Sequence, residues 1–282
     1  MNIMLEKIVM VTGANSGMGL ATTKELARRG AHVIMVCRSE KRGEIALEEA
    51  IKESGSHKIE LMICDLGDLN SIRRFADEYK ARFKVLDVLV NNAGVVSLKR
   101  QLTQHGFEMH LGINHLGHFL LTNLLLDQLM LAEQGRIVNV SSGAYKVGKI
   151  HVADPTLKKN YNVAKGYAQS KLANILFTKQ LAVKLRGTRV TANCLHPGAV
   201  VTNLGVDRQT GFGKRVYSLL RPFFLSPDQG SQSAIYLATA PELSSVSGEY
   251  FYRQKIQTVS PRANQIQDAE WLWRWSEEQV GL

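Results

Sequence analysis

The chain has 282 residues, of which 45% are hydrophobic and 21% charged, with a formal net charge of +10. These values are ordinary for a soluble globular protein, and the length suits one large domain with a substantial core. No run of 18 or more apolar residues occurs, so we expect no transmembrane helix. Three widely separated cysteines with no CxxC pair argue against disulfides and structural zinc.

Strand and helix patterns alternate along the chain. We expect strands at 7–12, 32–37, 59–64, 86–91, 136–141, 189–195 and 249–252, and helices at 17–29, 40–54, 69–82, 103–131, 163–186 and 227–239, with a helical tail at about 259–282. Such alternation predicts an α/β fold: a Rossmann-type, doubly wound parallel sheet of about seven strands, with helices on both faces. No linker or repeat divides the chain, so residues 1–282 are expected to form a single domain.

A glycine-rich turn follows the first expected strand. Residues 13–19 read Gly-Ala-Asn-Ser-Gly-Met-Gly and open the first helix. Glycines let the backbone approach phosphates, and a helix N-terminus offers free N–H groups. The spacing differs from the usual G-x-G-x-x-G fingerprint, and glycines are common in any turn. The place directly after the first strand nevertheless favours a nucleotide pyrophosphate site.

Two later strands also end in small or polar residues. Residues 91–94 read Asn-Asn-Ala-Gly after an apolar strand, and Ser141 and Ser142 end another. Ligands of an open parallel sheet lie across the carboxyl ends of its strands. Small residues there leave room for a flat ligand, amides can bond to ribose, and a serine can hold a carbonyl oxygen. The alternatives are an ordinary Asn/Gly turn and a serine helix cap.

Tyr167 and Lys171 lie four residues apart, just before an apolar helical run at 172–177. At that spacing both side chains share one helix face. A tyrosine titrates near pH ~10, and a fixed ammonium beside it is expected to lower that pKa toward the range of an acid–base catalyst. An isolated pair of this kind is usually a surface feature, but the other three motifs favour a catalytic one.

Together these motifs resemble the short-chain dehydrogenase/reductase family over residues 7 to about 252. They occur in that family's order: TGxxxGxG at 12–19, Asp65 after the third strand, NNAG at 91–94, Asn114, the serine pair, YxxxK at 167–171, and His-Pro-Gly at 196–198. The strings at 114–122 and 170–178, and the 25 positions from Ser142 to Tyr167, resemble the retinol-dehydrogenase-like branch. Met18, where isoleucine is commoner, and the tryptophan-rich tail are departures.

The resemblance implies a role for each matched position. Tyr167 would be the general acid or base, and Ser142, rather than Ser141, would bond the substrate oxygen. Lys171 would hold the nicotinamide ribose. Asn114 would kink its helix and hold a relay water, unless it is simply a buried amide. The positions expected to bind the cofactor are Gly13, Asn15, Ser16, Gly17, Met18, Gly19, Arg38, Asp65, Leu66, Asn91, Ala93, Gly94, Tyr167, Lys171, Pro197, Gly198 and Thr202.

For two of these positions, Arg38 and Asp65, a second interpretation stays open. A basic residue after the second strand suits the 2′-phosphate of NADP, so Arg38 favours NADP(H) over NAD(H). Arg38 could instead be a solvated loop residue, with Glu40 serving a ribose. Asp65 would bond the adenine amino group, or it could cap the next helix, although Asp68 and Asn70 are better placed for that. No metal-ligand set is present, and His115 and His118 are expected to pack in their helix.

The implied activity is NADP(H)-dependent interconversion of an apolar aldehyde or ketone with its alcohol. The apolar preference rests on an expected lid at 203–225, which is rich in valine, leucine and phenylalanine. Its basic residues Lys214, Arg215 and Arg221 are the counter-argument. The alternatives are a non-catalytic NADP(H)-binding sensor and a module that docks on a membrane or a partner.

The positive charge leaves several partner classes to weigh. The chain has no recognition-helix or RNA-binding signature, so we expect no nucleic acid and at most peripheral membrane contact, around 214–224. Since the first strand begins by Lys7, we expect no signal peptide or membrane anchor and a cytoplasmic location. The tryptophans at 271, 273 and 275 are two residues apart, so they cannot share one narrow helix face. We expect some of them to pack on the body of the protein. One is expected to reach the substrate cleft or a second subunit of a homo-oligomer.

Overall fold

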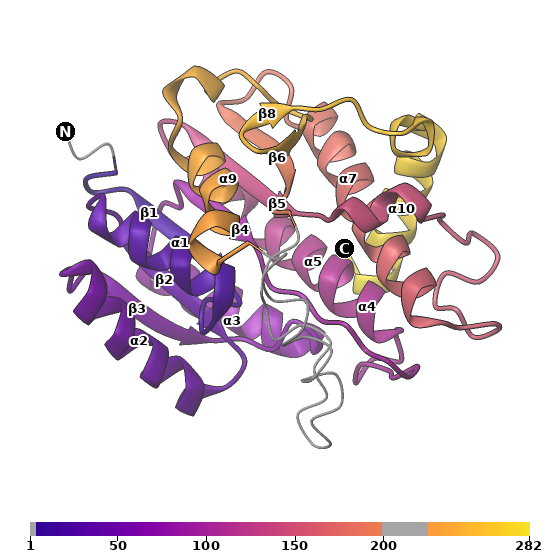
Figure 1. Ribbon diagram of the computed structural model, residues 1–282, viewed down its shortest axis with the longest axis horizontal. Coiled ribbons are helices and arrows are strands. Elements are labelled where there is room, and N and C mark those ends of the chain that lie inside the picture. Colours follow the sequence, from indigo (N-terminus) through magenta and orange to yellow (C-terminus); the bar gives the residue numbers. More distant parts are fainter. Residues whose placement is uncertain (1–3, 199–224) are drawn as a thin grey trace.

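The computed structural model describes residues 4–198 and 225–282. Thr202 and all of the expected lid at 203–225 except Leu225 lie outside the described residues. The described residues form one sheet of eight strands in the order β3-β2-β1-β4-β5-β6-β7-β8 (Figure 1). The strands are β1 Ile8–Thr12, β2 His32–Cys37, β3 Ile59–Ile63, β4 Val88–Asn91, β5 Gly135–Val140, β6 Val190–His196, β7 Tyr250–Tyr252 and β8 Lys255–Ile256. β1 to β7 pair in parallel, which confirms the predicted fold class.

The expected count of about seven strands is wrong by one, because β8 pairs antiparallel with β7. The two strands are joined through Arg253 and Gln254, both with positive φ, at 50° and 61°. Two successive positive φ values are typical of a tight type I′ hairpin, which usually contains asparagine or glycine. Since neither residue is present here, this hairpin could not be predicted from the residues at its turn.

Helices cover both faces of the sheet (Figure 1). One face carries α1 Gly17–Arg28, α2 Glu40–Ser54 and α9 Pro227–Thr239. The other carries α3 Leu69–Arg82, α5 His118–Leu124 and α7 Val163–Lys184, and α10 Ile266–Val280 packs on the outside of α7. In β1, Val9 and Val11 belong to the core under α1, whereas Met10 belongs to the core on the opposite face. This alternation is what a strand buried on both sides requires.

The single helix expected at 103–131 is wrong. Its helical structure begins at α4 Met109–Leu111, continues as a π-helix at Gly112–Gly117 and α5, and restarts as α6 Leu126–Met130. Residues 102–108 form a turn instead: Gly106 has φ 79°, and Leu102 bridges to Glu108. Glu108 then caps α4 with its carboxylate, accepting from the backbone N–H groups of His110 and Leu111.

The three tryptophans of α10 divide between two faces, as their spacing predicts. Trp273 is buried, and its ring centroid lies 4.9 Å from that of Phe119 and 5.8 Å from that of Phe177. Trp271 and Trp275 stack on each other with centroids 5.8 Å apart. These ring contacts of Trp273 anchor α10 to α5 and α7, so this tryptophan packs on the body of the protein.

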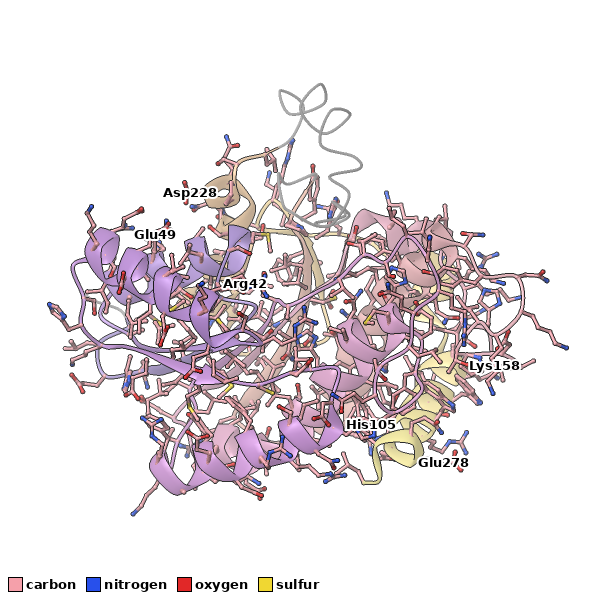
Figure 2. All side chains as sticks on the ribbon, turned by 90° about the horizontal axis from the view of Figure 1, so that it is seen from below. Arg42, Glu49, His105, Lys158, Asp228 and Glu278 are labelled. Atoms are coloured by element: carbon pink, nitrogen blue, oxygen red, sulfur yellow. The ribbon has the colours of Figure 1, made fainter. Side chains whose placement is uncertain are left out.

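Charged side chains are spread over the outside of the protein (Figure 2). Glu49 on α2 and Lys158 lie at opposite ends of the molecule in this view. Some of the basic residues are paired, as where Lys24 contacts Glu49 at 3.1 Å and Glu53 at 2.9 Å. Among the helices of the described residues, none has the length and apolar character to cross a bilayer.

The topology fixes where a ligand can bind. Strand order runs in one direction from β1 through β2 to β3, and in the other from β4 onward. The carboxyl ends of β1 and β4 therefore flank the switch point, where open α/β sheets bind their ligands. The glycine turn follows β1 and the Asn-Asn-Ala-Gly turn follows β4, so both meet at this crevice.

Candidate active site

The glycine turn after β1 is packed too closely for side chains. A Cβ on Gly19 would lie 2.3 Å from the carbonyl oxygen of Gly13. Gly13 has φ 65°, and a Cβ there would lie 2.9 Å from Cα of Ala93. Real Cβ atoms do not approach this closely, so both glycines are needed to press the turn against the loop after β4. The start of α1 is thereby held open toward the crevice.

Thr12 joins the two turns, and the sequence analysis did not single it out. Its hydroxyl oxygen accepts hydrogen bonds from the backbone N–H groups of Asn92 and Ala93, both at 2.9 Å. The Asn92 amide in turn donates to the carbonyl oxygen of Thr12 at 2.8 Å. In the sequence, these contacts could have been inferred from the Thr12 hydroxyl at the end of the first strand and the Asn92 amide after the fourth.

Asn91 points away from the crevice. Its side-chain amide donates to Thr122 Oγ1 at 2.9 Å and to Asn139 Oδ1 at 2.8 Å, and the residue is 2% exposed. These bonds tie β4 to α5 and β5. The side chain is therefore engaged inside the protein, so that only the backbone of Asn91 can face a ligand.

The remaining positions of the glycine turn line the start of α1. Ser16 precedes the helix in an extended conformation without a side-chain capping bond, and it is exposed. Gly17 has φ 55°, Asn15 is half-buried, and Met18 is buried in the core under α1. The Ser16 hydroxyl and the Asn15 amide therefore border the open end of the turn.

Two charged positions flank the crevice. Arg38, directly after β2, is exposed and makes no hydrogen bond or ion pair with any described residue. Asp65 uses Oδ1 to accept from the backbone N–H of Gly67 at 2.8 Å. The cap of α3 is Asp68, which accepts from the N–H of Asn70 at 2.9 Å, so Asp65 is not the helix cap.

Leu66, Pro197 and Gly198 lie in the loops that border the site. The carbonyl oxygen of Leu66 packs on the π-helix, where a Cβ on Gly117 would lie 2.4 Å from it. Pro197 and Gly198 follow β6 and are half-buried. Gly198 has φ 92°, and its N–H donates to His196 Nδ1 at 3.2 Å.

Tyr167 and Ser142 meet at the carboxyl end of β5. The Ser142 side chain lies close enough to the Tyr167 phenol to lower its pKa, and the Ser142 hydroxyl accepts from the N–H of Ala144 at 3.2 Å. Ser141 points elsewhere: its hydroxyl donates to the carbonyl oxygen of Lys171 at 2.8 Å. Of the two serines, Ser142 is therefore the one that faces the tyrosine hydroxyl.

The pKa of Tyr167 is raised from its ordinary value, not lowered. Burial disfavours the phenolate and is the largest cause, and the hydrogen bond from Ser142 opposes it. Lys171 Nζ lies over the tyrosine ring, 5.6 Å from its centroid. The expectation of a lowered tyrosine pKa is thus wrong for this structure, since burial raises it and Lys171 is not among the groups that shift it. The phenol stays protonated near neutral pH.

Lys171 is itself buried, with 3% of its surface exposed. Burial lowers its pKa to about 8, because the charged form loses hydration. Its Nζ donates to the carbonyl oxygen of Val140 at 3.1 Å, an oxygen that also accepts from Asn174 Nδ2 at 3.1 Å. A lysine of this kind can exchange its proton close to physiological pH.

The buried ammonium predicts a pH-dependent stability. In the unfolded chain the pKa of Lys171 is near its ordinary value of 10.5, and in the folded protein it is about 8. Below pH 8 Lys171 is charged in both the folded and the unfolded state, and burying this charge lowers the free energy of unfolding. As the pH rises from 8 to 10.5, Lys171 loses its proton in the folded state only, and this destabilising contribution is removed. We expect Lys171→Met to raise the free energy of unfolding at pH 7 by an amount on the order of 3 kcal/mol, and by much less at pH 10.

Urea unfolding of parent and variant at both pH values checks this. Lys179→Met, a change on the same helix at a half-buried position, is the control and should give a difference that does not vary with pH. An equal Lys171→Met effect at pH 7 and pH 10 would contradict the lowered pKa.

Asn114 lies within the π-helix, so the expected irregularity of its helix is present. Its Oδ1 accepts from the N–H of Val95 at 2.8 Å, and its Nδ2 donates to Ser170 Oγ at 3.1 Å. A Cβ on Gly94 would lie 3.6 Å from Asn114 Oδ1 and 3.7 Å from Lys171 Nζ. The bare backbone of Gly94 therefore leaves both polar groups at the edge of the crevice.

His118 was expected only to pack in its helix, but it connects Asn114 to the glycine turn. Its Nδ1 contacts the carbonyl oxygen of Asn114 at 3.1 Å, and its Nε2 contacts Thr12 Oγ1 at 2.9 Å. A carbonyl only accepts, so Nδ1 carries the proton and Nε2 accepts from the Thr12 hydroxyl. Burial lowers the pKa of His118 to about 4, which keeps this neutral form.

Comparison with known proteins adds the decisive observation. The family model for short chain dehydrogenases matches residues 7–211. The chain belongs to the short-chain dehydrogenase family. This short-chain dehydrogenase is 44% identical to mouse retinol dehydrogenase 12, over 98% of this chain and 87% of that protein. It is 45% identical to human retinol dehydrogenase 14, over 99% of this chain and 88% of that protein.

Solved structures agree on the fold. An uncharacterised protein from Mycobacterium paratuberculosis is 36% identical, with a TM-score of 0.79 over 98% of this chain and 94% of its own. A short-chain dehydrogenase from Shigella flexneri, solved with NADP, has a TM-score of 0.71 over 90% of this chain and 99% of its own, and its 22% identity supports the fold alone. The short-chain dehydrogenase described here is thus an oxidoreductase of the retinol-dehydrogenase-like group, which interconverts alcohols and carbonyl compounds.

Proposed function

We propose that this enzyme uses NADP(H) to interconvert an apolar aldehyde or ketone with its alcohol, with Tyr167 as the proton donor and acceptor. The observation that carries the proposal is the meeting of Tyr167 and Ser142 beside the buried Lys171. Ser142 faces the phenol, Lys171 Nζ lies over the tyrosine ring at 5.6 Å from its centroid, and a Cβ on Gly94 would lie 3.7 Å from Lys171 Nζ. Acid–base chemistry on a small polar group fits such a site.

The residues present fit a dinucleotide cofactor. The glycine turn leaves no room for a Cβ at Gly13 or Gly19, and the N-terminus of α1 opens toward the crevice, which suits a pyrophosphate. Arg38 is exposed, follows β2 and makes no hydrogen bond or ion pair within the described residues. This placement suits a ribose 2′-phosphate and supports NADP(H) over NAD(H). When bound, the nicotinamide supplies or accepts the hydride.

The protein's own residues would handle the oxygen of the substrate. Ser142 would bond the carbonyl oxygen and polarise it, and Tyr167 would give that oxygen its proton in reduction, for which a protonated phenol with a raised pKa is suited. Lys171, with a pKa of about 8, would hold the nicotinamide ribose and reprotonate the tyrosine. Asn114 would hold the water that links Lys171 to solvent.

The preference for an apolar substrate rests on two supports. The relatives named retinol dehydrogenase act, by their names, on an apolar alcohol. The segment 203–225, outside the described residues apart from Leu225, is rich in large apolar side chains. Burial of each additional CH₂ contributes roughly 0.8 kcal/mol, so kcat/KM should rise by about 4-fold per added methylene along a series of straight-chain aldehydes, until the site is full.

Steady-state kinetics on matched aldehydes test this preference. Each straight-chain aldehyde is compared with its ω-carboxylated counterpart of the same length, at low and high salt. Higher kcat/KM for the carboxylated series, lost at high salt, would overturn the apolar preference and would point to the basic residues Lys214, Arg215 and Arg221 as the acid's binding site. A flat dependence on chain length would also contradict it.

A non-catalytic NADP(H) sensor is the second candidate. Such a sensor needs the glycine turn and Arg38 but no Tyr167 facing Ser142, so the retention of this pair favours the enzyme. A cytoplasmic location remains a prediction from the sequence.

A further inference from the structure

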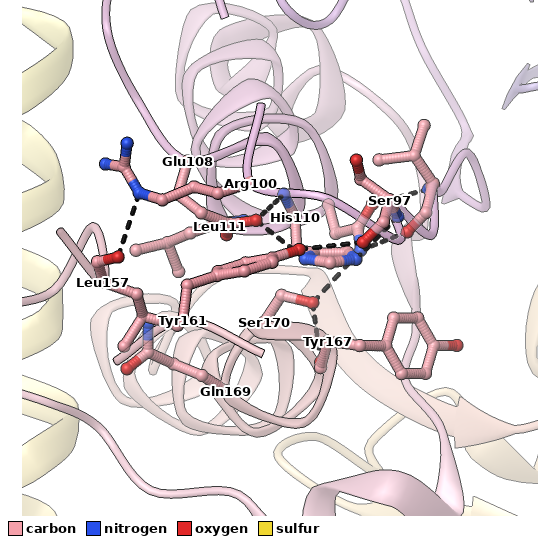
Figure 3. A network of polar contacts seen from close by, with 12 residues as sticks. Ser97, Arg100, Glu108, His110, Leu111, Leu157, Tyr161, Tyr167, Gln169 and Ser170 are labelled. Atoms are coloured by element: carbon pink, nitrogen blue, oxygen red, sulfur yellow. Dashed lines mark hydrogen bonds and ion pairs between the residues drawn. The ribbon is translucent and has the colours of Figure 1, made fainter. Parts of the chain in front are cut away.

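Close to the Tyr167 ring, two ionisable residues are completely buried on the segment that leads into the π-helix. Glu108 and His110 are both 0% exposed, and their side chains meet at 2.7 Å (Figure 3). Neither takes part in the chemistry described above. Burying a carboxylate and an imidazole together is costly unless every polar atom is bonded. Such a pair calls for an explanation.

Both ring nitrogens of His110 are held, and their roles are fixed. The backbone N–H of Ser97 points at Nε2 at 2.9 Å. An N–H can only donate, so Nε2 accepts, and the ring proton sits on Nδ1 and is donated to Glu108 Oε1. The imidazole is therefore neutral, and it cannot flip without losing both bonds.

Glu108 is held equally firmly. Oε1 accepts from the N–H of His110 and Oε2 from that of Leu111, both at 3.0 Å, at the N-terminal turn of α4. Backbone N–H groups at a helix start stabilise a carboxylate. The carboxylate thus anchors the imidazole to the helical segment that carries Asn114.

The held imidazole lies between two tyrosine rings. It stacks on Tyr161, with centroids 6.3 Å apart and an interplanar angle of 14°. It meets Tyr167 edge to face, with centroids 6.0 Å apart and an angle of 70°. Edge-to-face contacts within this range are favourable and directional. Tyr161 is fixed as well, since its hydroxyl donates to the carbonyl oxygen of Ser97 at 2.8 Å.

Gly166 makes this contact possible. A Cβ at that position would lie 2.7 Å from His110 Nδ1 and 3.4 Å from Glu108 Oε1. Residue 166, immediately before Tyr167, must therefore be glycine for the buried pair of Glu108 and His110 to pack against α7. The geometry of the pair and that of the tyrosine are coupled through this one glycine.

We propose that His110, locked by Glu108, is a positioning residue that sets the orientation of the Tyr167 ring, and with it the phenol oxygen. This inference rests on the proposed role of Tyr167 as proton donor. The imidazole touches neither the substrate oxygen nor the cofactor in this assignment; it restricts the tyrosine to the orientation in which the phenol meets Ser142. A displacement of about 1 Å at a reacting group can lower a rate by as much as 10²-fold.

Two variants of His110 separate the ring from its hydrogen bonds. Glutamine can accept from the Ser97 N–H and donate to Glu108, so His110→Gln keeps the polar network and removes the ring edge; His110→Ala removes both. We expect both variants to lower kcat by about 10- to 100-fold with KM for the cofactor changed less than about twofold. The solvent isotope effect on kcat should rise, because proton transfer from a misplaced phenol becomes slower.

The matched control is His115→Ala. His115 is also buried, on the same helical segment, but it contacts Ser276 Oγ at 2.9 Å and packs on Phe119 and Phe177. Its loss should lower Tm and leave kcat and the isotope effect unchanged. If His110→Gln behaves like His115→Ala, the pair is merely structural and the proposal is overturned.

Gly166→Ala gives a second, independent arm. Alanine favours a helix over glycine, but here its Cβ must push His110 away, so kcat should fall without a matching loss of Tm. In a His110→Ala background that obstacle is gone, and Gly166→Ala should have little further effect on kcat. If His110→Ala and Gly166→Ala lower kcat additively in the double variant, the proposed coupling between His110 and Gly166 is overturned.

A readout without turnover keeps this inference distinct from the proposed function. In protein labelled with ¹³C at the tyrosine Cζ, the Tyr167 signal is identified by its loss in Tyr167→Phe. We expect one narrow signal in the parent and a broadened or shifted one in His110→Gln. A parent that never turns over a carbonyl but shows this change would refute the proposed function alone. An unchanged signal would refute the positioning role.

Discussion

Replacing Tyr167 with phenylalanine is expected to lower turnover by about 10²- to 10⁴-fold, the usual contribution of a positioned acid or base. The change removes the hydroxyl that faces Ser142 and leaves the ring that packs against His110. Binding of NADPH should be nearly unchanged, because the ring and its packing are kept. Steady-state turnover and a fluorescence titration of NADPH measure the two effects separately.

Tyr236→Phe is the control for this variant. Tyr236 is half-buried on α9 and packs on Phe251, away from Ser142 and Lys171. Its replacement should leave turnover within about twofold of the parent, as is usual for a change outside a site. A Tyr167→Phe enzyme that keeps most of its activity on every accepted substrate would show that another group transfers the proton.

Arg38→Asp is expected to reverse the preference between NADP and NAD. It removes a cation suited to the 2′-phosphate and supplies a carboxylate suited to the bare ribose hydroxyls. Loss of a charge-assisted phosphate bond, together with the new repulsion, should weaken NADP by about 2–3 kcal/mol or more, which is roughly 30- to 150-fold in Kd. Titration calorimetry with each cofactor gives both affinities.

Lys52→Asp makes the same change of charge near the other end of α2, where the side chain is exposed. It should leave both cofactor affinities within about twofold. Unchanged NADP affinity in Arg38→Asp would show that Arg38 does not contact the phosphate, and Glu40 would then become the residue to test for a ribose.

The strand positions and the parallel fold were predictable from the sequence because each central strand is buried on both faces and reads as an apolar run. The π-helix and the β7–β8 hairpin were not. The first arises inside an otherwise helical pattern, and the second has Arg253 and Gln254 where asparagine or glycine is usual. Both depend on backbone conformations that the local residue types do not indicate.

The candidate site was predictable where chemistry and position coincide. Tyr167 and Lys171 follow from their spacing and the serine pair from the end of its strand, whereas the choice of Ser142 over Ser141 came from the resemblance to the family. The direction of the tyrosine pKa did not follow, because it depends on burial by residues distant in sequence. Glu108 and His110 were missed for the same reason: their partner Ser97 and the ring of Tyr167 are brought to them only by the fold.

The measurement that tests this function most directly is the consumption of NADPH in the presence of a long straight-chain aldehyde, followed together with the alcohol formed. We predict one alcohol per NADPH oxidised, a slower reaction with NADH, and loss of both signals in Tyr167→Phe. The proposed function would be contradicted if the parent protein binds NADPH but oxidises none of it with any aldehyde or ketone offered, and reduces no NADP with the matching alcohols.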